Sequence, residues 1–194
     1  MTLSPLRLDL GAGDTPQEGY QSVDLFSPSA AHRVNLCQFP WPWNDSSVDA
    51  LYSSHFLEHL PMVYVAPTGE YSAVPTSSED RDLLCRFMDE AYRVLAPRGQ
   101  FKIAVPSARS NRAFQDPTHR RFFVAESFHY FNRSWRDERG LGHYLCSCDF
   151  DIQVWPIVPN ELLKLPGYEQ AHRYNTEWNS TLDWHATLTS RKSG

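Results

Sequence analysis

The sequence of 194 residues has few cysteines, few lysines and no long hydrophobic run. Four cysteines in a chain of this length, with no apolar run near Met1 that would form a secretion signal, favour reduced thiols over a disulfide framework. We therefore expect a cytoplasmic protein. No stretch approaches the roughly 20 apolar residues of a membrane-spanning helix, so we expect no membrane partner. The length suits a single domain over residues 1–194 with a sizeable core.

Positive charge is scarce and unevenly distributed. The net charge is −5, so no overall basic field attracts nucleic acid. The chain has only three Lys against fifteen Arg, and seven of the Arg lie between Arg109 and Arg139. Guanidinium groups suit bidentate recognition of phosphate or carboxylate, whereas a solvated, salt-bridged face is the simpler alternative.

A third glycine is missing from what would otherwise resemble a dinucleotide-binding turn. Leu6 to Leu10 alternates as a short strand and runs into Gly11 and Gly13, and Tyr20 to Leu25 is a second strand that carries Asp24. An acid at this place can accept hydrogen bonds from ribose hydroxyls. Only residues 14–19 separate the glycine turn from the second strand, too few for an ordinary crossover helix on which a pyrophosphate could sit. The pattern favours a ligand with a ribose and no pyrophosphate, such as S-adenosylmethionine (SAM), or an ordinary glycine turn.

The remaining chain alternates strands with helices and irregular segments, as in an α/β protein. Residues 62–82, rich in Pro, Gly, Ser and Thr, predict a long irregular surface loop or a disordered segment. We assign no element to residues 133–148. The predicted elements are a strand at Arg33–Leu36, a strand at Val48–Ser53, a helix capped by Ser54 through Leu60, a helix at Leu83–Leu95, a strand at Gln100–Val105, a short helix at Ala125–Phe131, and strands at Phe150–Val158 and Leu182–Ser190.

Several motifs together resemble the Rossmann-like (class I) SAM-dependent methyltransferases over roughly Leu6 to Pro106. They are Leu8 to Gly13, Val23-Asp24, Ser47 to Asp49, His55 to His59 and Glu90 to Gly99. The most similar group has a shortened first crossover and an H-x-L-E-H segment, and Asp116 to Phe123 resembles a segment in some of its members, including phage-encoded ones. The resemblance implies one three-layer α/β domain whose seven-stranded sheet is mostly parallel, with one antiparallel strand. Arg98 departs from the family pattern, which has Pro-Gly-Gly there.

The resemblance also implies a cofactor, SAM, with S-adenosylhomocysteine as product. The backbone of Gly11, Ala12 and Gly13 would lie beside its methionine portion, with Asp24 on the ribose hydroxyls. Asp9 would orient the glycine turn or a water near the ammonium group. The other cofactor-binding candidates are Leu25, Leu36, Ser53, Ser54 and His55.

The expected reaction is methyl transfer to an O or N atom of a small or conjugated acceptor, which the arginines suggest is anionic. Residues 107–160 would form the substrate side, and Arg112, Arg120 and Arg121 are the candidates for acceptor binding. An acceptor that must lose a proton needs a base. The candidates are His119, Asp116 and His55, and a positioning role stays open for each.

Three alternatives stay open. The chain could be a non-catalytic SAM-fold scaffold, and a homodimer is possible. His55 to His59 also matches the H-x-x-E-H pattern of inverted zinc proteases, and His143, Cys146 and Cys148 could begin a metal site, but we expect no metal at either place. No Asp/Asn-Pro-Pro-Tyr/Phe motif and no Pro-Cys pair is present, so DNA is not the expected acceptor.

Overall fold

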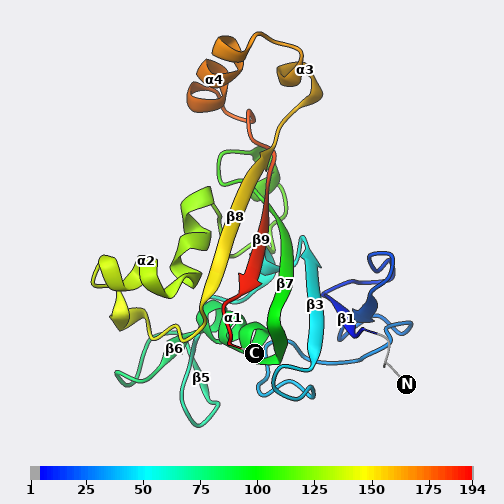
Figure 1. Cartoon of the computed structure of the whole chain (residues 1–194), viewed down its shortest axis with the longest axis vertical. Coiled ribbons are helices and arrows are strands. Elements are labelled where there is room, and N and C mark those ends of the chain that lie inside the picture. The colour runs from blue at the N-terminus through cyan, green and yellow to red at the C-terminus, as the bar shows by residue number, and fades with distance from the viewer. Residues whose placement is uncertain (1–4, 194) are drawn as a thin grey trace.

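The computed structural model describes residues 5–193. Its main sheet has six strands, and five of them run in the same direction (Figure 1). The antiparallel strand, β9, lies between β7 and β8. In sheet order the strands are β2 (Gln21–Val23), β1 (Arg7–Leu10), β3 (Val48–Ser54), β7 (Leu95–Pro106), β9 (Asp183–Ser190) and β8 (Phe150–Ile157).

The α/β class, the mostly parallel sheet and the antiparallel last strand are confirmed, but the seven-strand prediction is wrong. Arg33–Leu36 is not a strand, and the only pairing there is an isolated parallel bridge between Val23 and His32. Asn35 explains the loss, because its side-chain oxygen accepts from Cys37 N at 3.0 Å and its carbonyl accepts from Gln38 N at 3.0 Å. These two bonds close a turn where the strand would have continued.

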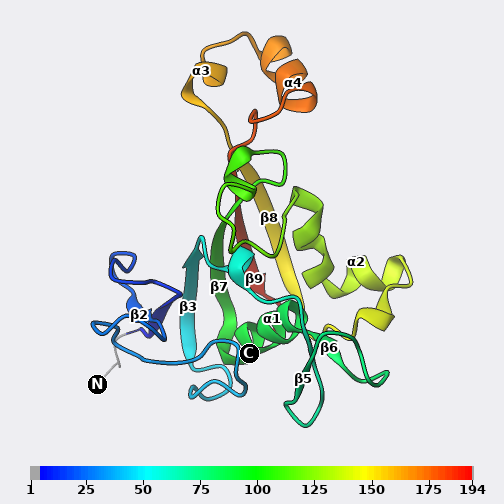
Figure 2. The same cartoon turned by 180° about the vertical axis from the view of Figure 1, so that it is seen from behind.

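Helices cover one face of the sheet, so the described residues form two layers rather than the expected three. Figures 1 and 2 show α1 (Leu83–Val94) and α2 (Arg133–Glu138) on the same side. On β7, the buried Phe101 and Ile103 face α1 and alternate with the exposed Gln100 and Lys102. The crossover of residues 14–19 is too short to form a helix over the other face.

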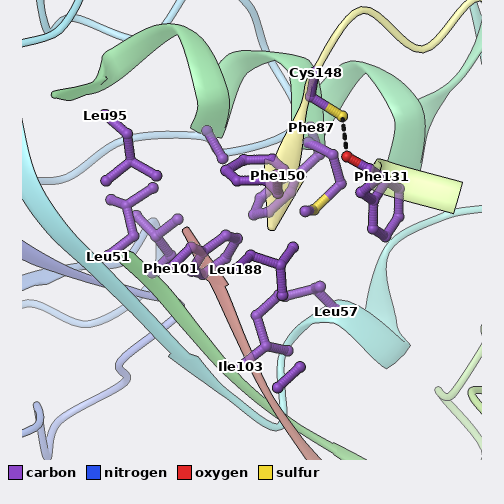
Figure 3. Packing of buried hydrophobic residues seen from close by; sticks show 14 of the residues in the cluster. Leu51, Leu57, Phe87, Leu95, Phe101, Ile103, Phe131, Cys148, Phe150 and Leu188 are labelled. Carbon is purple, nitrogen blue, oxygen red and sulfur yellow. Dashed lines mark hydrogen bonds between the residues drawn. The ribbon is translucent and has the colours of Figure 1, made fainter. Parts of the chain in front are cut away.

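The core lies between this sheet and α1 (Figure 3). Asp82 caps α1 by accepting from Leu84 N at 2.8 Å. An i, i+4 stripe of Leu83, Phe87 and Ala91 on α1 is fully buried against the strands. The helix prediction is confirmed to within one residue, and the chain passes directly from Val94 at the end of α1 to Leu95 at the start of β7. Arg98, within β7, has a φ of 63°.

Residues 62–82 contain a small second sheet rather than an unbroken irregular loop. Its three strands are β5 (Tyr71–Ser72), β4 (Tyr64–Val65) and β6 (Arg81–Asp82), in that order. The carboxylate of Asp80 holds the turn before β6, because it accepts from the backbone and hydroxyl groups of both Thr76 and Ser77. Local side-chain bonds therefore order a segment that has little hydrophobic content.

The substrate-side region contains short helices. They are η2 (Asn111–Ala113), η3 (Ala125–Phe131), α2 and η4 (Gly142–Tyr144). Buried Arg136 on α2 donates to the carbonyls of Tyr130, Cys146 and Cys148, which fixes the segment that the sequence left unassigned. Between β8 and β9, α3 (Asn160–Leu163) and α4 (Gly167–Thr176) project beyond the end of the sheet (Figure 1). None of the helices described between residues 5 and 193 is long and apolar enough to span a bilayer.

Candidate cofactor and acceptor site

The glycine turn follows β1 at the carboxyl edge of the sheet, where open α/β sheets bind ligands. Gly11 and Gly13 have φ values of 75° and 55°, in the left-handed region that favours glycine. Gly11 is doubly constrained, because a Cβ there would lie 2.3 Å from the ring of Phe56. Its N–H donates to Val23 O at 2.8 Å, which joins the turn to β2. The turn is therefore fixed by backbone geometry and one close aromatic contact.

Asp24 is bound to this turn and stays ionised. Its Oδ2 accepts from Gly13 N at 3.0 Å, and its Oδ1 accepts from Phe26 N at 2.7 Å and Ser27 N at 2.9 Å. Partial burial raises the pKa of Asp24, but the three backbone donors together hold it below its usual value. A carboxylate offers about four acceptor positions, so roughly one remains for a further donor such as a ribose hydroxyl.

Asp9 holds the short crossover against β1. Asp9 is 3% exposed, and its carboxylate accepts from Gln17 N at 2.7 Å. Burial raises the pKa of Asp9, and this hydrogen bond opposes the rise. Asp9 also lines a cavity of about 340 Å³ between the glycine turn, the crossover and the end of β3. The cavity is lined by Asp9, Gly11, Ala12, Thr15, Pro16, Gln17, Glu18, Tyr52 and Ser54.

The predicted cofactor residues lie in four kinds of place. Asp9, Gly11, Ala12 and Ser54 line the cavity, while Gly13 and Asp24 form the adjoining loop. Leu25 is exposed beside that loop. Leu36 and Ser53 point elsewhere: Leu36 is packed in the core, and the buried Ser53 hydroxyl donates to Leu10 O at 3.0 Å. Ser53 can therefore only support the glycine turn from beneath.

His55 lies just beyond β3 and is hydrogen-bonded to a buried carboxylate. Its side chain is half-exposed, and its Nδ1 is 3.2 Å from Oε1 of Glu58, which is 1% exposed. The hydrogen bond to Glu58 is the largest cause that raises the pKa of His55, and burial opposes it. The predicted helix here is shorter than expected: η1 (Leu57–His59) is one 3-10 turn, and Ser54 belongs to β3 rather than capping it. Since no α-helix forms, His55 and His59 do not share the helical face that a zinc-protease motif requires.

The segment after η2 crosses η1 and brings the other predicted catalytic residues to Glu58. Arg120 N and Arg121 N donate to Glu58 O at 2.7 and 3.0 Å. His119 Nε2 lies 4.0 Å from Glu58 Oε1. Asp116 is tied by hydrogen bonds of 2.7 Å to the backbone and hydroxyl of Thr118, which hold its pKa below the usual value. The structure thus brings His55 and His119 to the carboxylate of Glu58, whereas Asp116 reaches His59 only through Thr118. The burial of Glu58 was not apparent from the sequence pattern.

The predicted acceptor arginines are not equivalent. Arg121 is almost buried and forms a bidentate salt bridge with Asp82, at 2.8 and 3.2 Å. Arg112 is paired with Asp183. Arg120 is exposed, donates to the carbonyls of Pro117 and His119, and has no carboxylate partner among residues 5–193. Arg120 therefore retains an uncompensated charge.

A shelf of exposed aromatic rings includes Phe122, which directly follows Arg121 in the sequence. Phe114 stacks on Phe122 at 4.8 Å between ring centroids and on Trp178 at 6.0 Å. Each of the three side chains is about half exposed. Trp178 is fixed by a 2.6 Å hydrogen bond from its Nε1 to Asn111 Oδ1. This aromatic shelf (Phe114, Phe122 and Trp178) joins two neighbouring parts of the 107–160 region to Trp178, which lies far along the chain.

No protein-family model and no curated protein matches the chain. Solved structures do match it. A SAM-dependent methyltransferase from Archaeoglobus fulgidus has a TM-score of 0.60 and 16% identity, over 96% of this chain and 86% of that one. A putative methyltransferase in complex with the Haloferax volcanii Trm112 methyltransferase activator gives 0.54 and 13%, over 98% and 83%. A Methanosarcina mazei SAM-dependent methyltransferase gives 0.51 and 13%, over 100% and 95%. The chain therefore has the Rossmann-like fold of class I SAM-dependent methyltransferases.

Proposed function

We propose that the protein is a SAM-dependent methyltransferase. The observation that carries the proposal is the ionised Asp24, hydrogen-bonded to the glycine turn beside a polar cavity at the carboxyl edge of a sheet of methyltransferase type. A fold alone does not define an activity, but this acid, turn and cavity are the parts that a ribose-bearing ligand needs.

The chemistry of these groups fits the proposed cofactor. The free acceptor position of Asp24 suits a ribose hydroxyl, and the exposed Leu25 offers an apolar surface to adenine. The cavity of about 340 Å³ is within the usual range for small-molecule sites, roughly 300–1,000 Å³. Asp9 and Ser54 would contact the amino-acid portion. When bound, SAM would supply a methyl group already activated on a sulfonium sulfur.

The chain's own contribution would be to position the acceptor and to accept its proton. Much of the acceleration of an in-line transfer comes from orientation and exclusion of water. His55 Nδ1 lies at the Glu58 carboxylate, which leaves Nε2 to accept a proton from an O or N atom of the acceptor. His55 suits this role better than His119, whose side chain is 8% exposed and whose Nδ1 donates to Ala113 O at 2.9 Å. Asp116 would act through Thr118 rather than on the acceptor.

The acceptor site would lie at the aromatic shelf and Arg120. Stacked, half-exposed rings favour a planar or apolar group, and an uncompensated guanidinium favours phosphate or carboxylate. We therefore infer an acceptor that carries a planar or apolar group together with a phosphate or a carboxylate. Arg112 could contribute, whereas Arg121 is committed to Asp82 and would only support the site.

Calorimetric titration with SAM, with S-adenosylhomocysteine and with NAD tests the cofactor. We expect micromolar binding of the two sulfur ligands and none of NAD. Asp24→Ala should weaken that binding by about 10- to 100-fold, the effect of losing a hydrogen bond to a charged group. Asp151→Asn, a change of an exposed acid on β8, is the control and should bind as the wild type does. If neither SAM nor S-adenosylhomocysteine binds, the proposal is overturned and a non-catalytic scaffold with this fold is favoured.

An acceptor screen with labelled SAM would then test the substrate side. Arg120→Ala should raise the acceptor KM and leave SAM affinity unchanged. An unchanged acceptor KM in Arg120→Ala would reject the anionic acceptor.

A further inference from the structure

Glu58 is a buried carboxylate whose hydrogen bonding is incomplete. Its Oε1 lies near His55, but no donor among residues 5–193 reaches its Oε2. A buried carboxyl oxygen without a hydrogen-bond partner is costly, so native proteins rarely leave one unless an ion or a bound group completes it. The orphaned oxygen is thus an observation that points to a ligand.

Two histidines lie against this carboxylate. One ligand atom each from Glu58, His59 and His119 lies within 4.8 Å of the other two. The rings of His59 and His119 meet edge to face, with centroids 4.7 Å apart. His59 belongs to the same short turn as Glu58, whereas His119 arrives from the segment that crosses it.

The hydrogen bonds of both rings leave the same nitrogen free. His119 Nδ1 faces a carbonyl, Ala113 O at 2.9 Å, which can only accept, so this nitrogen carries the proton. His59 Nδ1 lies 3.0 Å from Thr118 Oγ1, and that hydroxyl donates its own proton to Asp116 Oδ1 at 2.7 Å. His59 Nδ1 is therefore also a donor. Each ring keeps its Nε2 lone pair.

We propose that Glu58, His59 and His119 form a binding site for one divalent transition-metal ion of the zinc class. Two neutral imidazoles and one carboxylate are a known three-ligand set for zinc, with a fourth position open to water or substrate. Protons on the outer nitrogens, held by a carbonyl and by a hydroxyl–carboxylate pair, are the arrangement that orients ligating histidines. The ligands of a tetrahedral zinc ion lie roughly 3.3 Å apart, so the ion would draw the three side chains slightly together.

This site is distinct from the pair that the H-x-x-E-H pattern suggests. His55 Nδ1 lies 3.2 Å from Glu58 Oε1, the same oxygen that lies 4.0 Å from His119 Nε2, and His55 does not belong to the cluster of Glu58, His59 and His119. The ion would also join η1 to the 116–121 segment, so its binding should stabilise the folded chain. The inference does not depend on the proposed methyl transfer.

Titration of the chelator-treated protein with Co²⁺ and with Zn²⁺ tests the site. We expect one equivalent of Co²⁺ to produce the d–d absorption of a site with nitrogen ligands, and Zn²⁺ to displace it. His59→Ala and His119→Ala should each weaken binding by at least about 100-fold and abolish the rise in Tm that Zn²⁺ causes in the wild type. His172→Ala, a change of an exposed histidine on α4, is the matched control and should bind normally.

Asp116 is a positioning residue in this account. Asp116→Asn should weaken metal binding by about 10-fold, within the range for partners that orient ligating histidines. Nitrogen NMR of the metal-free wild type should show His59 and His119 protonated at Nδ1, a readout that needs no variant to fold. Failure of the wild type to bind one equivalent, unchanged binding in both histidine variants, or protons on Nε2 of the two rings would overturn the site.

Discussion

The two sides of the carboxyl edge are built in different ways. On the side of β1 and β2, backbone groups and nearby carboxylates shape the glycine turn, and Asp24 reaches no further than residues 13–27. On the side of β7 and the 107–160 region, side chains from distant segments meet, as in the Arg121–Asp82 salt bridge and the Trp178–Asn111 hydrogen bond. The first side depends mainly on local backbone, together with the contact between Gly11 and Phe56, whereas the second depends on contacts between many distant segments.

Gly11→Ala should have the largest effect on stability and should disrupt the glycine turn on the cofactor side. Both the positive φ and the ring of Phe56 oppose a Cβ there, so we expect a loss of about 2–4 kcal/mol in unfolding free energy and loss of SAM binding. Gly140→Ala is the matched control: its φ is 65°, but a Cβ there meets nothing within 4 Å. Its cost should be only about 1 kcal/mol. Equal costs in chemical denaturation would reject the role of the Phe56 contact.

Arg121→Ala should destabilise the acceptor side without changing the affinity for SAM. The change removes a largely buried partner of the α1 cap Asp82 and a 3.0 Å bond from Nε to Leu60 O, so we expect a loss of about 1–3 kcal/mol. SAM affinity should be unchanged. A double-mutant cycle with Asp82→Ala isolates the salt bridge, and a coupling energy near zero would contradict this prediction.

Arg98→Gly should stabilise the protein slightly. Arg98 adopts a φ of 63°, where glycine is favoured, and its 3.8 Å pair with Asp151 is too exposed to contribute much. We expect a gain of roughly 0.5–1 kcal/mol in unfolding free energy, with no change in cofactor affinity. A measured loss of stability would mean that Arg98 makes a stabilising contribution greater than the cost of its backbone conformation.

Acid should loosen residues 76–80. Four hydrogen bonds from Thr76 and Ser77 lower the pKa of Asp80 from 3.8 to about 2. A lowered folded-state pKa contributes stability that is present above pH 3.8 and is lost as the pH falls towards 2. Amide exchange in residues 76–80 should therefore accelerate over this interval. In Asp80→Asn the acceleration should already be present at neutral pH, and slow exchange there would show that other contacts hold the turn.

The cofactor side could be predicted from the sequence more fully than the acceptor side, because its structure depends mainly on residues that are close in the sequence. The glycine turn, the strand before it and α1 follow from local spacing and periodicity, whereas the antiparallel last strand was expected from the resemblance to the methyltransferase family. Arg33–Leu36 was predicted to be a strand from its β propensity. The turn made by the Asn35 side chain outweighs that propensity in the structure. The second helical layer was expected from the family, although the short crossover argues against it.

The acceptor side could not be predicted in the same detail. The burial of Glu58 and its proximity to His119 depend on a segment 60 residues away, and no local pattern carries that information. The arginine cluster shows the same limit. Its members are similar in sequence, yet Arg136 is buried among carbonyls, Arg121 pairs with Asp82, and Arg120 remains exposed.

Mapping the binding of S-adenosylhomocysteine on nitrogen-labelled protein by NMR tests the central claim most directly. The account predicts that the largest shifts fall on the amides of Gly11, Gly13 and Phe26, with little change at Gly69 or Gly140. Shifts concentrated on the second sheet or on η4, with the glycine turn unmoved, would contradict the account and place the ligand elsewhere.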